Sequence, residues 1–298
     1  MDKRTTETTG ISLPPPFAGW FADKGWTPRE HQLALVEKSA LGQSALLIAP
    51  TGAGKTLAGF LPALIDLNAR GKKKPGMAFR GIHTLYISPL KALAVDIERN
   101  LERPVTEMGL PITIETRTGD TPQHKRTRQR LNPPDILLTT PEQLALLIAS
   151  SEAERFFKDL QFVIFDELHS LVTSKRGHLL SLGLARLRTL APALKTIGLS
   201  ATVAEPDDLR RWLVAQRPEE TNLSALVTVT GGARPIITIL GTEERIPWQG
   251  HSARYAMGEI YAAIKSAKTT LIFVNQRRIA ERAARHLAER LGEEHVTA

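Results

Sequence analysis

Cysteine is absent from this chain of 298 residues. Without cysteine the protein has no disulfide, no thiolate ligand for a metal and no cysteine nucleophile, so three classes of site are excluded. A chain without disulfides suits a reducing compartment, and we therefore expect a cytoplasmic protein.

Long hydrophobic runs are absent as well. No apolar stretch approaches the roughly 20 residues that span a bilayer. Residues 1–10 are polar, where a signal peptide would carry its hydrophobic segment. We expect no membrane partner and no export.

Acidic residues are in the minority. The chain has 31 Asp and Glu against 39 Lys and Arg, which gives a formal net charge of +8. This charge fits a polyanionic partner, most simply nucleic acid, although a well-solvated basic surface would have the same composition. With 42% hydrophobic residues the chain can bury a core, and its length is enough for two domains of ordinary size.

The most informative pattern lies at residues 49–56, Ala-Pro-Thr-Gly-Ala-Gly-Lys-Thr, directly after the apolar run 44–48. A strand, a glycine-rich loop and a helix in this order cradle the phosphates of a nucleotide. Lys55 is predicted to reach the β and γ phosphates of ATP, and Thr56 to hold Mg²⁺. Ala49 stands where the strict pattern has glycine, but the two glycines nearest the phosphates are kept. The predicted nucleotide-binding residues of this loop are Thr51, Gly52, Ala53, Gly54, Lys55 and Thr56.

Short β-rich runs alternate with helical patterns along the chain. These runs are residues 44–48, 83–88, 112–116, 136–139, 162–165 and 196–199. The alternation predicts an α/β fold with a parallel sheet that helices cover on both faces. Ligands of such sheets bind at the carboxyl ends of the strands, so we expect the loops there to form one functional face.

Two of these loops have the residue types of a nucleotide hydrolase. Asp166 and Glu167 follow the run 162–165; Asp166 is predicted to hold Mg²⁺, and Glu167 to orient and deprotonate the attacking water. A helix N-cap is the alternative for an isolated acidic pair. Ser200 and Thr202 follow the next run and are predicted to contact His169 or the carboxylates, although a turn that caps a helix uses the same residue types.

Gln32 lies upstream of the phosphate loop on an expected helix, residues 29–41. Its amide offers a donor and an acceptor that suit the edge of adenine, which would select ATP over GTP. An isolated Gln on a helix is otherwise a solvated residue. The predicted catalytic set is Lys55, Asp166, Glu167 and His169, and Gln32 joins the predicted nucleotide-binding set.

Three further loops are predicted to face nucleic acid. Their hydroxyl and amide groups lie at expected helix starts, an arrangement that binds backbone phosphate without reading base sequence. Each is also an ordinary helix start. The residues are Ser88, Pro89 and Lys91 in the first loop, Thr118 and Gly119 in the second, and Thr140 and Pro141 in the third. A basic cluster after the second loop, Lys125, Arg126, Arg128 and Arg130, either widens this track or forms a solvated helix face.

The sequence changes character after about residue 203. It continues with β-like stretches at 225–230 and 236–240, a helix at 252–265, a strand at 270–274, an amphipathic helix at 276–291, and the start of another strand at 295. We expect a first domain at 1–235, a linker at 236–250 and the start of a second domain at 251–298. The strand at 270–274 would lack most of its sheet partners, which leaves an apolar edge open to association.

Taken in order, these stretches resemble the motifs of a superfamily 2 DEXH-box helicase over nearly the whole chain. The matching positions are Gln32 and residues 49–56, 88–93, 139–142, 166–169, 200–202 and 271–277. Within that superfamily, residues 20–28, 175–179 and 231–235 resemble the Lhr-type, ligase-associated DNA helicases of bacteria.

The resemblance implies a P-loop NTPase with a RecA-like sheet, followed here by an incomplete second RecA-like domain. It also implies ATP hydrolysis coupled to translocation along single-stranded DNA and to unwinding, a role in DNA repair, and further domains in the same longer chain.

One departure from the family bears on activity. Motifs V and VI, whose arginines act at the γ phosphate, have no counterpart in this sequence. An arginine finger contributes on the order of 10³ to 10⁵ in rate, so we expect a truncated chain that binds ATP with little turnover. Two alternatives stay open: a non-catalytic fragment that binds nucleic acid or a partner, and an ATP-dependent RNA helicase.

Overall fold

The computed structural model describes residues 12–71, 79–201, 203–229, 236–241 and 256–297. The chain divides into two compact units, Met1–Gly232 and Ala233–Ala298. The predictions for Thr202, for residues 231–235 and for residues 242–250 of the linker lie outside the described residues.

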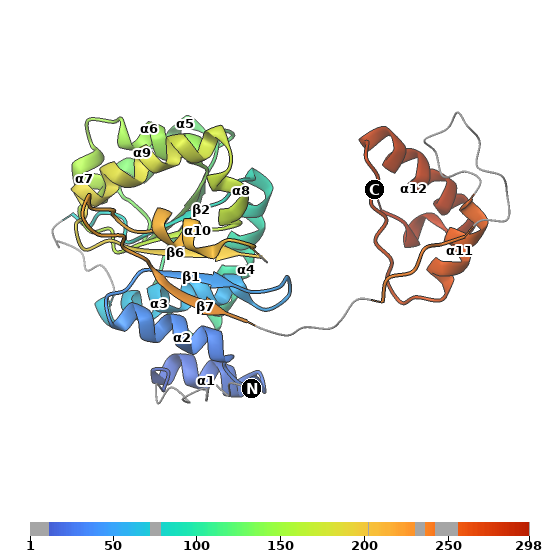
Figure 1. Ribbon diagram of the computed structural model, residues 1–298, viewed down its shortest axis with the longest axis horizontal. Coiled ribbons are helices and arrows are strands. Elements are labelled where there is room, and N and C mark those ends of the chain that lie inside the picture. The colour runs from blue at the N-terminus through green and yellow to red at the C-terminus, as the bar shows by residue number, and fades with distance from the viewer. Residues whose placement is uncertain (1–11, 72–78, 202, 230–235, 242–255, 298) are drawn as a thin grey trace. The chain divides into compact units, whose positions relative to one another are not determined.

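The first unit is a parallel sheet between two layers of helices (Figure 1). Its strands are β1 (Ala45–Ile48), β2 (Thr84–Ile87), β3 (Ile114–Arg117), β4 (Ile136–Thr139), β5 (Phe162–Phe165), β6 (Lys195–Ser200) and β7 (Ala225–Thr228). Its helices are α1 (Pro15–Asp23), α2 (Glu30–Ala40), α3 (Lys55–Arg70), α4 (Lys91–Glu107), α5 (Gln123–Leu131), α6 (Pro141–Ile148), α7 (Ala153–Phe157), α8 (Leu168–Val172), α9 (Lys175–Leu190) and α10 (Pro206–Trp212). The predicted α/β fold with helices on both faces is confirmed.

The two layers follow from the alternation of side chains along buried strands. On β1, Ala45 and Leu47 pack into one hydrophobic core with α2, α3 and α4, whereas Leu46 and Ile48 pack into the other core with α6, α9 and α10. β5 divides in the same way, since Ile164 belongs to the first core and Val163 to the second. Both faces of the central strands are therefore apolar, as expected for a fully covered parallel sheet.

The sheet has the strand order β3-β4-β2-β5-β6-β1-β7, and every pair is parallel. The β-like stretch predicted at 225–230 is β7, which pairs with β1 and completes one edge. The carboxyl ends of all seven strands lie along the same edge of the sheet, which is where the predicted site residues follow them.

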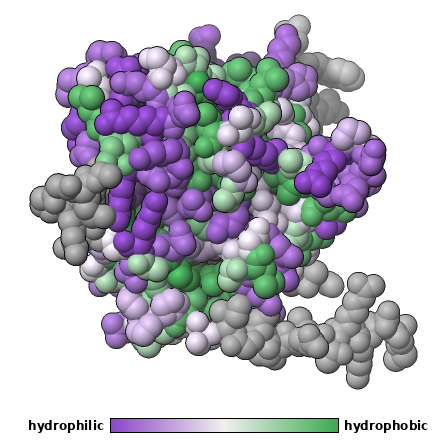
Figure 2. Space-filling view, turned by 90° about the vertical axis from the view of Figure 1, so that its left-hand side faces the viewer, coloured by the Kyte–Doolittle hydropathy of each residue, from purple (hydrophilic) through white to green (hydrophobic). Residues whose placement is uncertain are grey.

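The surface of the first unit is mixed. Seen from the left-hand side of Figure 1, hydrophilic and hydrophobic residues are interspersed among the coloured residues (Figure 2). Single exposed apolar side chains of this kind are normal for a folded protein. None of the helices in the described ranges combines the length and the apolar character that a membrane span requires.

The second unit contains α11 (Met257–Lys265), α12 (Arg277–Leu291) and the short 3₁₀ helix η2 (Glu293–His295). The strands predicted at 236–240, at 270–274 and from 295 are wrong, because no strand pairing forms at the described residues there. A strand needs a neighbour for its backbone hydrogen bonds, and Leu271 and Phe273 are instead 78% and 89% exposed.

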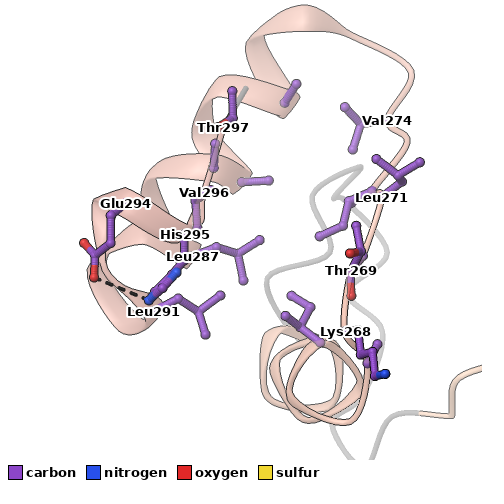
Figure 3. A pocket seen from close by; sticks show the side chains of 17 residues that line it. Lys268, Thr269, Leu271, Val274, Leu287, Leu291, Glu294, His295, Val296 and Thr297 are labelled. Atoms are coloured by element: carbon purple, nitrogen blue, oxygen red, sulfur yellow. Dashed lines mark ion pairs between the residues drawn. The ribbon is translucent and has the colours of Figure 1, made fainter.

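A cavity of about 720 Å³ lies inside this second unit. Figure 3 shows Leu271 and Val274 on an extended segment at one side of the cavity, and Leu287 and Leu291 of α12 with Val296 and Thr297 at the other. Two helices and two unpaired segments leave this space open, and Leu287 is the buried residue of α12. We interpret the cavity as an incompletely filled core.

Candidate functional site

The strand order sorts the predicted site residues into two groups. Asp166 follows β5, Ser200 is the last residue of β6 and the phosphate loop follows β1, and these three strands are neighbours. The loops after β3, β4 and β2 carry Thr118, Thr140 and Ser88, and they occupy the other half of the same edge. The predicted nucleotide residues and the predicted nucleic-acid residues are thus adjacent along one face without being mixed.

The phosphate loop has the backbone that its glycines permit. Gly52 and Gly54 have φ values of 80° and 76°, in the left-handed region that residues with a Cβ rarely adopt. Gly54 is the N-cap of α3, and Lys55 and Thr56 form the first turn of that helix. Lys55 Nζ donates to the carbonyl oxygens of Ala49 at 2.9 Å and Pro50 at 3.3 Å, so its ammonium lies over the loop. The helix N-terminus and this ammonium together favour a bound phosphate.

Helix α2 supports the phosphate loop through residues at its start. Gln32 is buried, accepts a hydrogen bond from the Arg29 N–H at 2.9 Å, and has its Nε2 beside Gly54. The predicted nucleotide contact of Gln32 therefore starts from a fixed side chain rather than a solvated one. The structure adds two supports that the sequence reasoning missed: Arg29 Nη1 donates to Gly52 O at 3.2 Å, and His31 Nε2 lies 2.9 Å from Ala53 O.

His31 is an internal strut of the phosphate loop. Burial lowers the pKa of its imidazole, against the opposing effect of its hydrogen bond to Ala53. A neutral ring donates to the Ala53 carbonyl through Nε2–H. In the sequence, the one indication of this contact is that His31 directly precedes Gln32 on the same expected helix.

The acidic pair follows β5 directly. Asp166 is buried, and its carboxylate accepts hydrogen bonds from the Tyr86 hydroxyl and, at 3.0 Å, from the Glu167 N–H. Glu167 is the one non-glycine residue of the described chain with a positive φ, 46°. Strained backbone of this kind clusters at functional sites. Here the Asp166 carboxylate contacts Tyr86, whereas the Glu167 carboxylate lies beside His169.

Tyr86 has no counterpart in the predictions made from sequence. It lies on β2, next to β5 in the sheet, and its ring stacks on Phe60 with the ring centroids 5.0 Å apart. Burial raises the pKa of its hydroxyl above its ordinary value, and the Asp166 carboxylate raises it further. The hydroxyl therefore stays protonated at neutral pH, where it can donate to Asp166. A tyrosine in an apolar strand gives no local signal of that contact.

His169 connects the acidic pair to the next strand. Its Nδ1 lies 2.9 Å from Ser200 Oγ, and its Nε2 lies 3.6 Å from Glu167 Oε2. The predicted contact between His169 and the loop after β6 is present through Ser200.

Thr56 and Asp166 are the residues predicted for Mg²⁺. They follow β1 and β5, the two strands that flank β6. Within the described residues no group of three or more His, Asp or Glu side chains is placed to hold a metal. One carboxylate and one hydroxyl suit Mg²⁺, which takes a few protein oxygens and completes its shell with phosphate and water.

The predicted nucleic-acid residues divide into exposed and buried ones. Lys91 and Gly119 are exposed, and Pro89 is half-buried, whereas Ser88, Thr118, Thr140 and Pro141 are buried. The hydroxyls of Ser88 and Thr118 serve the turns themselves, since Ser88 Oγ donates to Leu90 O at 3.2 Å and Thr118 Oγ1 accepts from the Asp120 N–H at 3.3 Å. Backbone N–H groups and Lys91 are thus the groups of these loops that can meet a phosphate from outside.

Salt bridges and hydrogen bonds tie the second of these loops to its surroundings. Lys91 Nζ lies 3.0 Å from Asp120 Oδ1, and Arg126 Nη2 donates to Thr118 O at 3.1 Å and to Gly119 O at 2.6 Å. Arg128 pairs with Glu115 at 2.7 Å. In the basic cluster, Arg126 therefore shapes the loop and Arg128 is partly neutralised.

Three comparisons bear on this site. The family model of the DEAD/DEAH box helicase matches residues 29–209, which span the phosphate loop, the acidic pair and Ser200. A Lhr helicase/probable uracil glycosylase of Mycolicibacterium smegmatis is 38% identical over 93% of this chain and 18% of its own length. An ATP-dependent helicase Lhr-Core of Methanothermobacter thermautotrophicus is 36% identical over 85% of this chain and 30% of its own length.

Among solved structures, that of Mycobacterium smegmatis helicase Lhr bound to ssDNA and AMP-PNP has a TM-score of 0.76 and 35% identity. The match covers 94% of this chain and 37% of that one. The RecA-like character expected for the sheet is thereby confirmed. The chain spans only about a fifth to a third of the length of these two curated relatives.

Proposed function

The chain belongs to the DEAD/DEAH box helicase family, and from this membership we propose that it is the ATP-binding motor portion of an ATP-dependent DNA helicase. The single observation that carries the proposal is the sheet order, which sets the phosphate loop, the acidic pair and Ser200 side by side at the ends of β1, β5 and β6. The similar Lhr structure is described as bound to ssDNA and AMP-PNP, which supports an adenine nucleotide and DNA as the two ligands.

In this mechanism the phosphate loop binds MgATP. The N–H groups at the start of α3 and the Lys55 ammonium receive the phosphates. The Gln32 amide, which lies beside Gly54, would contact the edge of adenine. Thr56 and Asp166 would hold Mg²⁺, which neutralises the charge that develops on the phosphates. Glu167 orients and deprotonates the attacking water.

His169 is proposed to report the state of the nucleotide site to its neighbours. His169 contacts both Glu167 and Ser200. A movement of the Glu167 carboxylate would therefore shift His169 and, through it, Ser200 at the end of β6. The loops after β3, β4 and β2 are proposed to bind the phosphates of single-stranded DNA, through Lys91 and backbone N–H groups. The whole protein would couple the two sites to translocation and unwinding.

The nucleotide site is tested by a pair of substitutions. We expect Lys55→Ala to abolish binding of MgATP by the 298-residue chain, because the ammonium over the phosphates is lost. We expect Glu167→Gln to retain binding but to lower hydrolysis by the full-length protein about 10²- to 10⁴-fold, the usual contribution of a general base. Binding is measured by calorimetry, and phosphate release is measured with and without single-stranded DNA.

Lys158→Ala and Glu154→Gln, two exposed residues, are the matched controls. If Lys55→Ala and Glu167→Gln behave like these controls, the proposed site is wrong.

We propose DNA rather than RNA as the substrate because the similar Lhr structure is described as bound to ssDNA. Competition between matched DNA and RNA strands tests this choice, since the two differ by the 2′-hydroxyl. A role in DNA repair is part of the proposal. The Escherichia coli relative is named a Lhr helicase/uracil glycosylase, and the Mycolicibacterium smegmatis relative a Lhr helicase/probable uracil glycosylase. The test is a strain in which the gene is deleted. We expect its survival to fall when uracil accumulates in its DNA.

A further inference from the structure

The stretch Lys175–Leu179 has no part in the proposed hydrolysis, although it was one of the sequence features that resemble Lhr-type helicases. It forms the start of α9, where the Ser174 hydroxyl accepts a hydrogen bond from the Gly177 N–H and caps the helix. A Cβ at Gly177 would lie 2.4 Å from Leu171 O and 2.6 Å from Val172 O. Only glycine allows this backbone contact between α9 and α8, the helix that carries His169.

Arg176 leaves this locked turn and contacts two separate loops. Its Nε lies 2.5 Å from Glu142 Oε1, and its Nη2 lies 3.1 Å from Glu142 Oε2, which is a bidentate pair. Its Nη1 donates to Pro89 O at 2.8 Å. Glu142 is in the first turn of α6 after β4, and Pro89 follows β2, so one guanidinium joins the ends of two neighbouring strands.

We propose that Arg176 is a positioning residue that holds the loops after β2 and β4 in the arrangement that binds single-stranded DNA, and that it ties both loops to the helix of His169. This inference rests on the proposed function. The chain of contacts runs from Glu167 and His169 through α8 and the Gly177 contact to Arg176, and from there to Pro89 and Glu142. Each link is a direct contact between packed groups, and chains of such contacts can carry coupling between two sites.

The hydrogen bonds of Arg176 fit a positioning residue rather than a ligand of DNA phosphate. Three of its five N–H groups are engaged, and the Glu142 carboxylate opposes its charge. Burial would raise the pKa of Glu142, but the hydrogen bonds from Arg176 and from the Thr140 hydroxyl outweigh burial and lower it. Glu142 is therefore a carboxylate at neutral pH, and it would repel a phosphate placed on the outer side of Arg176.

An electrostatic role and a positioning role predict opposite effects of substitutions at Glu142 on the affinity for DNA. Glu142→Gln removes a negative charge from a surface that is proposed to bind a polyanion, so electrostatics alone predicts equal or tighter DNA binding. Positioning predicts weaker binding, because the bidentate pair is broken. Arg176→Lys keeps the charge but loses the planar fork, so positioning predicts no rescue by lysine.

The experiment measures the dissociation constant of a fluorescein-labelled oligo(dT) by anisotropy with the full-length protein, with and without AMP-PNP and Mg²⁺. We expect Glu142→Gln and Arg176→Lys each to weaken DNA binding about tenfold, within the range of mutations along a coupling network. Affinity for AMP-PNP without DNA, and the slope of binding against salt concentration, should stay unchanged. Asp208→Asn is the matched control, since it breaks the exposed pair with Arg211, 2.8 Å apart, on α10.

Glu142→Gln that binds DNA as tightly as the unaltered protein would overturn the positioning role. So would Arg176→Lys with normal affinity, or Arg176→Ala whose salt slope falls by about 0.7, the value for one lost phosphate contact on a single strand. Unaltered protein that does not bind oligo(dT) at all would instead overturn the proposed function. Thermal unfolding of each variant identifies any loss that comes from misfolding.

Discussion

At the residue scale, the predicted metal ligand Asp166 depends on a side chain that is not itself expected to touch the nucleotide. Tyr86 donates to Asp166 from the adjacent strand, and its ring is held by Phe60. A buried carboxylate that loses one of its donors keeps its desolvation cost with less compensation, and Asp166 would retain the Glu167 N–H. The orientation of a predicted metal ligand thus rests on an aromatic residue of the core.

Tyr86→Phe tests this dependence. We expect the free energy of unfolding to fall by about 1 to 3 kcal/mol, because Asp166 is left without its hydroxyl donor in a buried position. We also expect ATP hydrolysis to fall about tenfold, the usual effect of removing a residue that orients a metal ligand. Chemical denaturation and phosphate release are the measurements.

Tyr261→Phe is the control for Tyr86→Phe, because it removes a hydroxyl from a tyrosine of α11 that is only half-buried. A Tyr86→Phe variant with unchanged stability and unchanged hydrolysis would show that Asp166 needs no support from β2.

At the element scale, an acidic residue of α4 adds polar contacts to the apolar packing of Phe17, Trp20 and Phe21 that holds α1 in the first core. Glu107 accepts a hydrogen bond from Trp20 Nε1 at 2.7 Å and pairs with Lys24 at 2.8 Å, both on α1. Arg103 pairs with the same carboxylate from within α4, at 3.0 Å. The hydrogen bonds from Lys24, Trp20 and Arg103, in that order of size, lower the pKa of Glu107 to about 2.

The docking of α1 should accordingly be sensitive to acid. The pKa of Glu107 is lower in the folded chain than in the unfolded one, so its contribution is complete above the ordinary carboxyl pKa of about 4.3 and is lost as the pH falls toward about 2. We expect Trp20 fluorescence to change over this window in the unaltered protein, and Glu107→Gln to remove that part of the change. Glu102→Gln, an exposed residue of the same helix, should leave the profile unaltered. An acid transition that is the same in all three proteins would contradict this role of Glu107.

At the scale of the whole molecule, the two units differ in how completely they bury their apolar side chains. The first unit encloses the sheet on both faces, whereas the second leaves Leu271 and Phe273 largely exposed beside an open cavity. Large exposed apolar groups on an unpaired extended segment favour association with other chains.

We therefore expect the 298-residue chain to self-associate with rising concentration, and the double substitution Leu271→Lys with Phe273→Lys to reduce this association. Sedimentation velocity measures the effect. Leu182→Lys is the control, since Leu182 is 73% exposed on α9 in the first unit. Association that persists in the double variant, or that Leu182→Lys removes equally, would assign it to another surface.

The sequence by itself determined the local features of the protein, because these depend on short-range patterns. The pattern at residues 49–56 predicted a phosphate loop between a strand and a helix, and the structure has β1, a loop with Gly52 and Gly54 at positive φ, and α3 in that order. Short apolar runs between helical patterns predicted six strands of the sheet and their parallel direction. The acidic pair after 162–165 could be assigned because a strand end is a defined place in such a fold.

Only the tertiary structure decided which of these features are neighbours. The order β3-β4-β2-β5-β6-β1-β7 is set by how the crossover helices pack, and no local pattern encodes it. That order brings Tyr86 to Asp166 and Arg176 to both Glu142 and Pro89, and it buries the hydroxyl-bearing residues Ser88 and Thr140. The same limit explains the strands wrongly predicted after residue 235: an extended apolar segment becomes a strand only when another backbone lies beside it, and the sequence of the segment does not say whether one does.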